Sequence, residues 1–212
     1  MPRRPLIAID GPAGSGKSTV ARAVARRLGL DHLDTGAMYR AVAYAALDRG
    51  VDPSDAAALG AVAEEVVIEV GESVVTVDGV DVSAAIRGPE VTAAVSAVAA
   101  VAAVRAEMVR RQRAWAGGRA GAVVEGRDIA SVVFPDAELK VYLTASDAER
   151  TRRRSSETGI ANTASVAADL ARRDDLDSSR AASPLLIADG ARVIDTTGLS
   201  VDEVVDQLLA LL

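Results

Sequence analysis

The chain has 212 residues, a formal net charge of −6, no cysteine and one histidine, His32. It is long enough for one domain, and without cysteines it can form neither a disulfide framework nor a thiolate metal site. One histidine leaves a zinc site short of ligands, and we expect His32 to be structural. The acidic balance argues against a nucleic-acid surface, although all basic residues except Lys17 and Lys140 are arginines.

The first predicted elements are a short strand over residues 6–9 and a glycine-rich loop, GPAGSGKS, over residues 11–18. Its glycines permit a turn so tight that successive backbone N–H groups point inward, and such a concavity binds anions. Lys17 adds a mobile positive charge, Ser18 adds a hydroxyl suited to Mg²⁺, and a helix over residues 18–29 starts at the same spot. The pattern predicts a triphosphate cradle made by Gly11, Pro12, Ala13, Gly14, Ser15, Gly16, Lys17, Ser18 and Thr19.

Beyond this helix the pattern alternates between strands and helices. We expect strands that end near residue 33 and that cover residues 122–125, 138–144 and 192–197, and a polar turn at 34–36. We expect helices over residues 37–50, 56–65, 89–115, 146–159, 165–184 and 201–212. Such alternation specifies an α/β fold with a parallel sheet, in which ligands bind at the carboxyl ends of the strands. In the last helix, helical spacing predicts core packing of Val201, Val204, Val205, Leu208, Leu209 and Leu212.

A small antiparallel insert interrupts this alternation. Residues 66–82 alternate apolar and polar side chains, and Asp78 with Gly79 is a type I′ hairpin signal. The sequence contains no internal repeat and no low-complexity linker. The hairpin therefore indicates an appendage of one core and not a second domain.

Two arginines follow predicted strand ends. Arg40 comes after the turn that follows the second strand, and Arg127 comes after the strand ending at Glu125, where acidic residues suit a Walker B position. Both would face the sheet edge near the glycine-rich loop. Because a guanidinium can hold a phosphate at two points, two arginines beside a triphosphate suit a second, acceptor phosphate. The pattern predicts a kinase for a small phosphorylated substrate.

Other nucleotide-binding classes fit less well. A GTPase needs an N-K-x-D or T-K-x-D signal, and Lys140 in ELKVYL has neither the preceding nor the following residue, while DTTG at 195–198 matches D-x-x-G only by spacing. A motor or switch ATPase leaves the arginines at the strand ends unexplained. A kinase of another acceptor, such as shikimate or a different nucleotide, and a nucleotide switch with a protein partner stay open.

Several stretches together carry a resemblance to a known family. IDGPAGSGKST, DTGAMYRA, EGRDI with VVFPDAELKVYLTAS, and RRDDLDSSRAASPL occur in an order, and across essentially the whole chain, that resembles bacterial cytidylate kinases of the P-loop nucleoside monophosphate kinases. The resemblance implies one domain over residues 1–212, with a monophosphate-binding insert at about 37–115 and a mobile lid at about 150–182. It also implies ATP-dependent phosphorylation of CMP and dCMP, with Mg²⁺.

The same resemblance implies roles for individual residues. On the donor side it implies catalytic roles for Lys17, Arg127, Arg150 and Arg154, the last two reaching ATP from the lid, with Ser18 on Mg²⁺. On the acceptor side it implies Arg40 and Arg127 on the phosphate, Thr35, Arg105, Asp128 and Arg180 around the pyrimidine, Ser96, Arg173 and Asp177 at the ribose, and Tyr39 beside them. From the residues alone, other readings stay open: packing for Tyr39, a solvated helix face for residues 152–154, surface ion pairs for residues 173–180, and a structural ion pair for Asp128.

The chain departs from the family pattern at two places. Ala130 and Ser131 stand where the family usually has glycine and threonine, and the proline often found before the equivalent of Arg105 is missing. Ala130 has less backbone freedom than glycine, so we expect a local adjustment without loss of activity.

The N-terminal stretch MPRRPLIAID has too short an apolar run for a signal peptide, and no later stretch spans a membrane without charge. We therefore expect a cytoplasmic monomer that binds ATP and CMP or dCMP, and neither nucleic acid nor a membrane.

Overall fold

The computed structural model describes residues 5–180 and 183–212, and the chain divides into two compact units. The first unit comprises Met1–His32 and Arg119–Leu212, and the second comprises Leu33–Gly118. The predicted insert at 37–115 lies within the second unit, and the predicted lid at 150–182 lies within the first, its last two residues falling outside the described part. The first four residues of the sequence also lie outside it.

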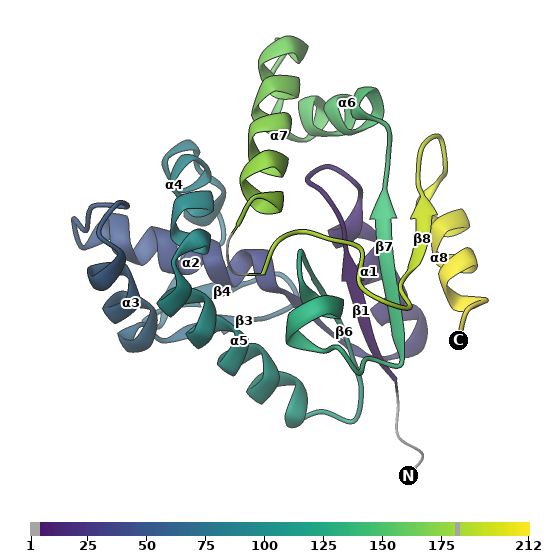
Figure 1. Ribbon diagram of the computed structural model, residues 1–212, viewed down its shortest axis with the longest axis horizontal. Helices are drawn as coiled ribbons and strands as arrows, with labels where there is room; N and C mark the ends of the chain where they lie inside the picture. The colour runs from purple at the N-terminus through teal and green to yellow at the C-terminus, as the bar shows by residue number, and fades with distance from the viewer. Residues whose placement is uncertain (1–4, 181–182) are drawn as a thin grey trace. The chain divides into compact units, whose positions relative to one another are not determined.

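The larger of the two sheets has five strands in the order β2-β6-β1-β7-β8 (Figure 1). Its strands are β1 (Leu6–Asp10), β2 (Asp31–Asp34), β6 (Ala122–Gly126), β7 (Leu139–Thr144) and β8 (Arg192–Asp195). The pairs β1–β6, β1–β7 and β7–β8 are parallel, and Asp10 is in register with Gly126. The expected α/β fold with a parallel sheet is confirmed, and β1 and β6 end beside each other.

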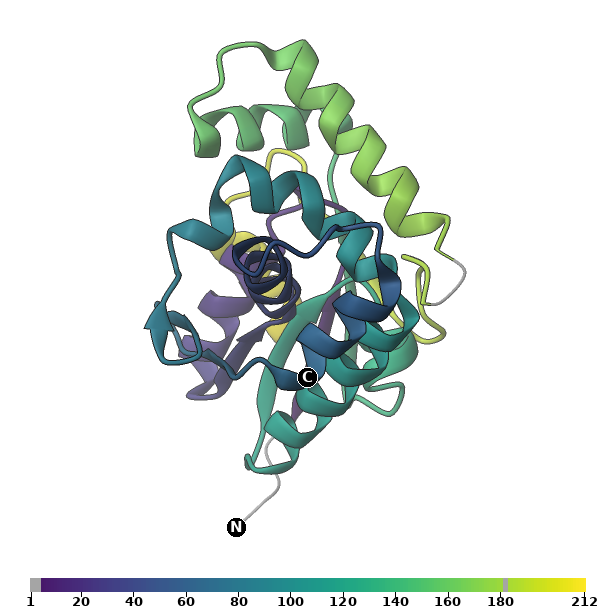
Figure 2. The same cartoon turned by 90° about the vertical axis from the view of Figure 1, so that its left-hand side faces the viewer.

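The helices of the first unit follow the strands. They are α1 (Lys17–Leu28), α6 (Asp147–Thr158), α7 (Thr163–Ser178) and α8 (Val201–Leu209), with a short π-helical turn, η2 (Ile129–Val133). Helices α6 and α7 lie side by side (Figures 1 and 2). Helix α7 starts at Thr163 because Asn162 caps it, accepting the Ser165 N–H, and it ends at Ser178, before the expected residue 184. Arg180 therefore lies beyond the helix.

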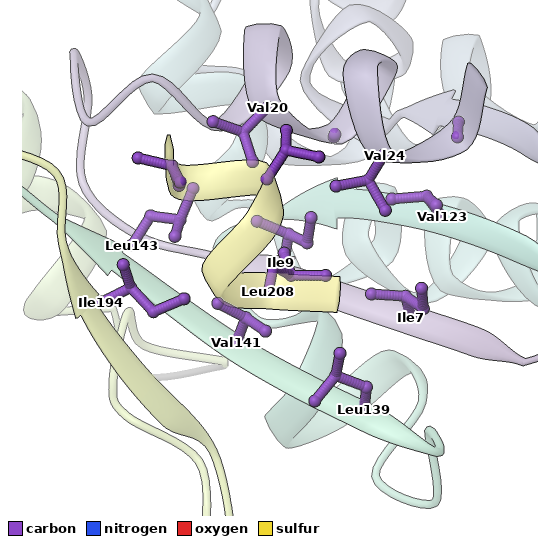
Figure 3. Close-up of a cluster of buried hydrophobic side chains, with 14 residues drawn as sticks. Ile7, Ile9, Val20, Val24, Val123, Leu139, Val141, Leu143, Ile194 and Leu208 are labelled. Carbon is purple, nitrogen blue, oxygen red and sulfur yellow. The ribbon is translucent and has the colours of Figure 1, made fainter. Parts of the chain in front are cut away.

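The core of the first unit lies between this sheet and the helices α1 and α8. In Figure 3, Ile9 of β1 and Val141 of β7 face Val24 of α1 and Leu208 of α8, and all four side chains are buried. Burial of each such side chain stabilises the fold by about 1.5–3 kcal/mol. Helix α1 turns its arginines outward and ends at Gly29, whose positive φ of 62° suits the residue after a helix.

Helix α8 corrects one sequence expectation. Val204, Val205 and Leu208 are buried, and Leu209 packs partly against the core. Val201 and Leu212, however, are 39% and 55% exposed, so the prediction that they pack in the core is wrong. Val201 is the first helical residue, and the helix ends at Leu209, so the helical spacing cannot carry Leu212 to the buried face.

The second unit contains four helices and a small sheet. The helices are α2 (Thr35–Asp48), α3 (Ala56–Glu65), α4 (Pro89–Ala100) and α5 (Ala102–Gly117), with a 3₁₀ turn, η1 (Ala85–Arg87), and the strands are β3 (Ile68–Val70), β4 (Val75–Val77) and β5 (Val80–Asp81). The strands pair antiparallel, and the turn residues Asp78 and Gly79 have positive φ angles of 49° and 81°. This is the backbone that a type I′ turn requires, so the predicted hairpin is confirmed.

Two boundaries in the second unit differ from expectation. Helix α2 begins at Thr35, not residue 37, because the Asp34 carboxylate caps it by accepting the Ala37 N–H. The expected helical region 89–115 is broken at Val101, where the backbone is extended (φ −72°, ψ 121°), and α4 and α5 meet at an angle of 93°. Neither glycine nor proline marks the break in the sequence.

Within the described residues, no single helix is long and apolar enough to cross a membrane; the bent pair α4–α5 meets that criterion only when the two helices are taken together, by length and composition.

Gln112 is an unusual core residue of α5. It lies on the buried face of α5 with Val104 and Met108, is 1% exposed, and neither its amide nitrogen nor its amide oxygen has a hydrogen-bond partner in the described part of the chain. An unsatisfied buried polar group costs about 1–3 kcal/mol. We expect Gln112→Met, which keeps the size, to raise the melting temperature by about 2–4 °C in a thermal unfolding scan. A lower melting temperature would mean that the amide is hydrogen-bonded in solution.

Candidate active site

The glycine-rich loop joins β1 to α1 at the carboxyl end of the sheet. Gly11 and Gly14 have φ angles of 149° and 77°. A Cβ atom at Gly11 would overlap the carbonyl oxygen of Leu143, and one at Gly14 would lie 3.1 Å from the carbonyl oxygen of Arg150. Both positions therefore require glycine, for conformation and for space. Helix α1 starts directly after the loop, so its N-terminal N–H groups add to an anion-binding concavity.

Lys17 folds back onto this loop. Its Nζ donates to the carbonyl oxygen of Pro12 at 2.7 Å and to Ser15 Oγ at 3.4 Å, and the residue is 7% exposed. Burial and the nearby positive charge of Arg127 lower the pKa of Lys17 to about 7. An anion bound in the loop would favour the charged ammonium again.

Ser18, Glu125 and His32 form a chain of contacts at the ends of neighbouring elements. Ser18 Oγ donates to Glu125 Oε2 at 2.8 Å, and His32 Nε2 lies 3.1 Å from Glu125 Oε1. Glu125 is buried near the end of β6, as a Walker B carboxylate would be. Sequence reasoning assigned His32 no functional role, and the structure shows it holding this carboxylate; its place on the second strand was the available signal.

Arg150 and Asp174 both contact the backbone of Ala13 in the loop. Arg150 Nη1 donates to the Ala13 carbonyl oxygen at 3.1 Å, and the Ala13 N–H donates to Asp174 Oδ1 at 3.2 Å. Arg150 also pairs with Asp174 itself and with Asp147. The ion pair therefore ties α6 and α7 to the loop. Sequence reasoning missed Asp174, and the assignment of Arg150 to ATP stays a prediction.

The three consecutive arginines of α6 have different environments. Arg152 is exposed and pairs with Glu149, and Arg154 pairs with Glu157 at 2.9 Å. Arg153 instead reaches inward, where Nη1 donates to Thr196 Oγ1 at 2.8 Å and Nη2 to the Thr196 carbonyl oxygen at 2.7 Å. The same guanidinium also donates to the carbonyl oxygen of Ser15 in the loop. The hypothesis that residues 152–154 form a solvated helix face thus fits Arg152 but not Arg153.

Arg127 and its neighbours form a partly buried charged cluster after β6. Arg127 Nε donates to Asp177 Oδ2 at 2.8 Å, and Arg180 also pairs with Asp177, which is 3% exposed. Burial and the positive charge of Arg127 lower the pKa of Arg173. Asp128, directly after Arg127, is buried as well. Because Asp177 is buried, the hypothesis that residues 173–180 form surface ion pairs does not hold for Asp177.

The second unit holds the remaining predicted residues. Thr35, Tyr39, Ser96 and Arg105 are buried. The Arg105 guanidinium lies 5.6 Å from the centroid of the Tyr39 ring, a cation–π distance, and Nη1 donates to the Ala99 carbonyl oxygen. Arg40 Nη1 donates to the Ile86 carbonyl oxygen at 3.0 Å and to Thr92 Oγ1 at 2.9 Å. The second unit therefore brings Tyr39 and Arg105 together. The contact is compatible with packing of Tyr39 and with an Arg105 guanidinium held in place for a ligand.

Comparisons with known proteins agree with this geometry. Residues 7–212 match the family model for cytidylate kinase. The cytidylate kinase of Mycobacterium leprae (strain Br4923) is 48% identical over 210 residues, which cover 97% of this chain and 94% of the relative. A gluconokinase from Sinorhizobium meliloti 1021 has a TM-score of 0.51 at 16% identity, covering 99% of this chain and 91% of that one, a likeness that shows the fold alone.

A second group of relatives is longer than this chain. The bifunctional pantoate ligase/cytidylate kinase of Synechococcus sp. (strain CC9902) is 48% identical over 221 residues, which cover 100% of this chain and 46% of the relative. The chain thus spans less than half the length of the bifunctional relatives that it matches.

Proposed function

This chain belongs to the cytidylate kinase family, and on that basis we propose that it transfers the γ-phosphoryl group of ATP to CMP and dCMP. The observation that carries the proposal is the arrangement at the ends of β1 and β6. The loop with Lys17 follows β1, and Arg127 follows its parallel neighbour β6. This supports a triphosphate at the loop with an acceptor phosphate on Arg127.

The proposed chemistry needs no covalent intermediate. An oxygen of the acceptor phosphate attacks the γ-phosphorus of ATP, the bond from that phosphorus to the bridging oxygen breaks, and ADP leaves. The acceptor oxygen is already nucleophilic at neutral pH, so no general base is required, and catalysis is positioning and charge neutralisation. In this proposal Lys17 neutralises the β- and γ-phosphates, Arg127 holds the acceptor, and Arg150 and Arg154 act on ATP from the lid.

Mg²⁺ fits the residues at the loop. Ser18 Oγ and Glu125 Oε2 are hard oxygen atoms 2.8 Å apart, the kind of donor that Mg²⁺ takes. The described residues contain no group of three or more His, Cys, Asp or Glu side chains that could hold a metal, which suits an ion bound largely by phosphate oxygens and water. We propose that Ser18 holds the ion, with Glu125 beside it. The ion supplies neutralisation of the charge on the β- and γ-phosphates.

The remaining elements of the proposal concern the whole protein. We propose that ATP and CMP or dCMP are its partners, that it binds neither nucleic acid nor membrane, and that it works as a cytoplasmic monomer. We further propose one domain over residues 1–212, with a monophosphate-binding insert at about 37–115 and a lid at about 150–182.

A panel of nucleoside monophosphates tests the function. Purified protein is mixed with ATP, Mg²⁺ and CMP, dCMP, UMP, AMP or GMP, with shikimate as a further acceptor, and ADP formation is followed. We expect rapid ADP formation with CMP and dCMP and almost none without an acceptor. Slow hydrolysis that no acceptor accelerates would favour a nucleotide switch, and turnover with shikimate or another base would reassign the acceptor.

Arg40 provides a second test of the acceptor assignment. An ammonium cannot reproduce the two-point contact of a guanidinium with phosphate, so we expect Arg40→Lys to cost about 1.5–3 kcal/mol in kcat/KM. The KM for CMP should rise most. Arg49→Lys is the matched control, because Arg49 forms ion pairs only partly shielded from solvent, with Glu65 and Asp78. Weaker ATP binding with an unchanged KM for CMP would place Arg40 on the donor side.

A further inference from the structure

Asp10 is a buried carboxylate that the proposed chemistry does not use. It is the last residue of β1, directly before the glycine-rich loop, and it is 2% exposed. Its Oδ1 accepts the backbone N–H of Ile129 at 2.9 Å, and its Oδ2 accepts that of Ala130 at 2.8 Å. Burial raises the pKa of Asp10 to about 6, and the two N–H bonds act against that rise. The carboxylate is therefore mostly charged at neutral pH.

Both amides belong to the turn η2, which winds directly off Asp128. The N–H groups of Val132 and Val133 donate to the carbonyl oxygen of Asp128. The amides at the start of such a turn have no partner within it, and a negative charge beside them is favourable. A carboxylate from a different strand supplies that partner here. The N–H of Ala130 thus has its hydrogen-bond partner, and the φ angle of Ala130 is not in the left-handed region. Alanine therefore fits here without strain, although the family usually has glycine.

Strand β1 also holds the start of the segment 126–130, which runs from the end of β6 into the turn η2. Asp10 is in parallel register with Gly126, the last residue of β6. Between Gly126 and Ile129 lie only Arg127 and Asp128. The short segment that carries these two side chains is therefore tied to β1 on both sides, at Gly126 by the sheet and at residues 129–130 by the Asp10 carboxylate.

We propose that Asp10 is a positioning residue for the acceptor: through the amides of Ile129 and Ala130 it fixes the backbone from which Arg127 and Asp128 project. This inference rests on the proposed function, in which those two residues bind the monophosphate. Asp10 touches neither substrate in this role. Since a displacement of about 1 Å in a reacting group can cost a hundredfold in rate, a looser segment would weaken acceptor use before it weakens ATP binding.

The variant Asp10→Asn tests the role. An asparagine amide offers one acceptor oxygen, and its NH₂ group would face the second backbone N–H, so one of the two bonds is lost. We expect kcat/KM for CMP to fall by about tenfold to a hundredfold, while the Kd of ATP without acceptor stays within about twofold. Val205→Ala, a cavity in the core of the first unit, is the control for lost stability, and it should leave both values unchanged below its melting temperature. An equal loss of ATP affinity, or unchanged CMP kinetics, would overturn the proposal.

Amide exchange measured by NMR gives a readout that does not depend on enzyme activity. In the unaltered protein the Ile129 and Ala130 amides should exchange at least about a hundredfold more slowly than unstructured amides. In Asp10→Asn, exchange should quicken over residues 126–134 and not over the loop at 11–18. Unprotected amides in the unaltered protein would overturn the proposal. If the unaltered protein phosphorylates no nucleoside monophosphate while the exchange results hold, the proposed function fails and the tie between Asp10 and this segment stands.

Discussion

Replacing Lys17 with alanine should lower the rate of phosphoryl transfer to CMP by about a hundredfold to a thousandfold, the loss typical when one preorganised charge donor is removed. The physical reason lies in its position. The Lys17 side chain is buried against the loop and hydrogen-bonded to the Pro12 carbonyl oxygen, so the phosphate charge that we propose it neutralises would be poorly screened by water. The measurement is ADP formation at saturating ATP, CMP and Mg²⁺.

The fold should survive this change. Lys17 is buried, and burial lowers its pKa, so its ammonium group does not stabilise the core. Lys140→Ala is the matched control, since Lys140, the other lysine of the chain, contacts the Asp189 carbonyl oxygen at the protein surface. Circular dichroism checks folding of both variants. Near-normal turnover in Lys17→Ala would refute the assignment of the loop as the phosphate site.

The sequence predicted local features well because their causes are local. The glycine-rich loop and the hairpin at Asp78 and Gly79 each follow from a few neighbouring residues. The break at Val101 was not predictable in this way, because neither glycine nor proline stands there in the sequence. The exposed Leu212 shows the same limit, since a helical spacing does not say where the helix ends.

The sequence predicted one part of the candidate site and missed another, for a related reason. A motif identifies residues expected to face a ligand, but it does not identify the residues that hold the motif in place. Asp10, Asp174 and Arg153 contact backbone groups that lie 119, 161 and 138 positions away in the chain. Such partners leave no periodicity and no spacing in the sequence. The structure therefore adds a set of residues that position the predicted ones, and their number around the loop indicates how tightly its geometry is held.

Base selection is the second large effect that we expect, and it concerns Asp128. This carboxylate is buried directly after Arg127, at the start of the turn η2. A carboxylate only accepts hydrogen bonds. Cytosine offers an exocyclic amino group as a donor where uracil offers an oxygen, so a carboxylate facing that edge attracts the first base and repels the second. CMP and dCMP should be preferred over UMP by a few kcal/mol, which is about a factor of hundreds in kcat/KM.

Asp128→Asn separates base reading from a structural ion pair, because an amide can donate as well as accept. Under base reading, kcat/KM for CMP should fall by about a hundredfold while kcat/KM for UMP falls less or rises, so the ratio of the two moves toward one. Asp136→Asn is the matched control, with the same chemical change at an exposed residue shortly after the same turn, and it should leave that ratio unchanged. If Asp128 is merely structural, its removal would disturb the backbone around Arg127, which we propose to hold the phosphate common to both substrates. Its loss should therefore reduce turnover of CMP and UMP in equal proportion, and that outcome, or an unaltered protein that uses UMP as well as CMP, would rule out base reading by Asp128.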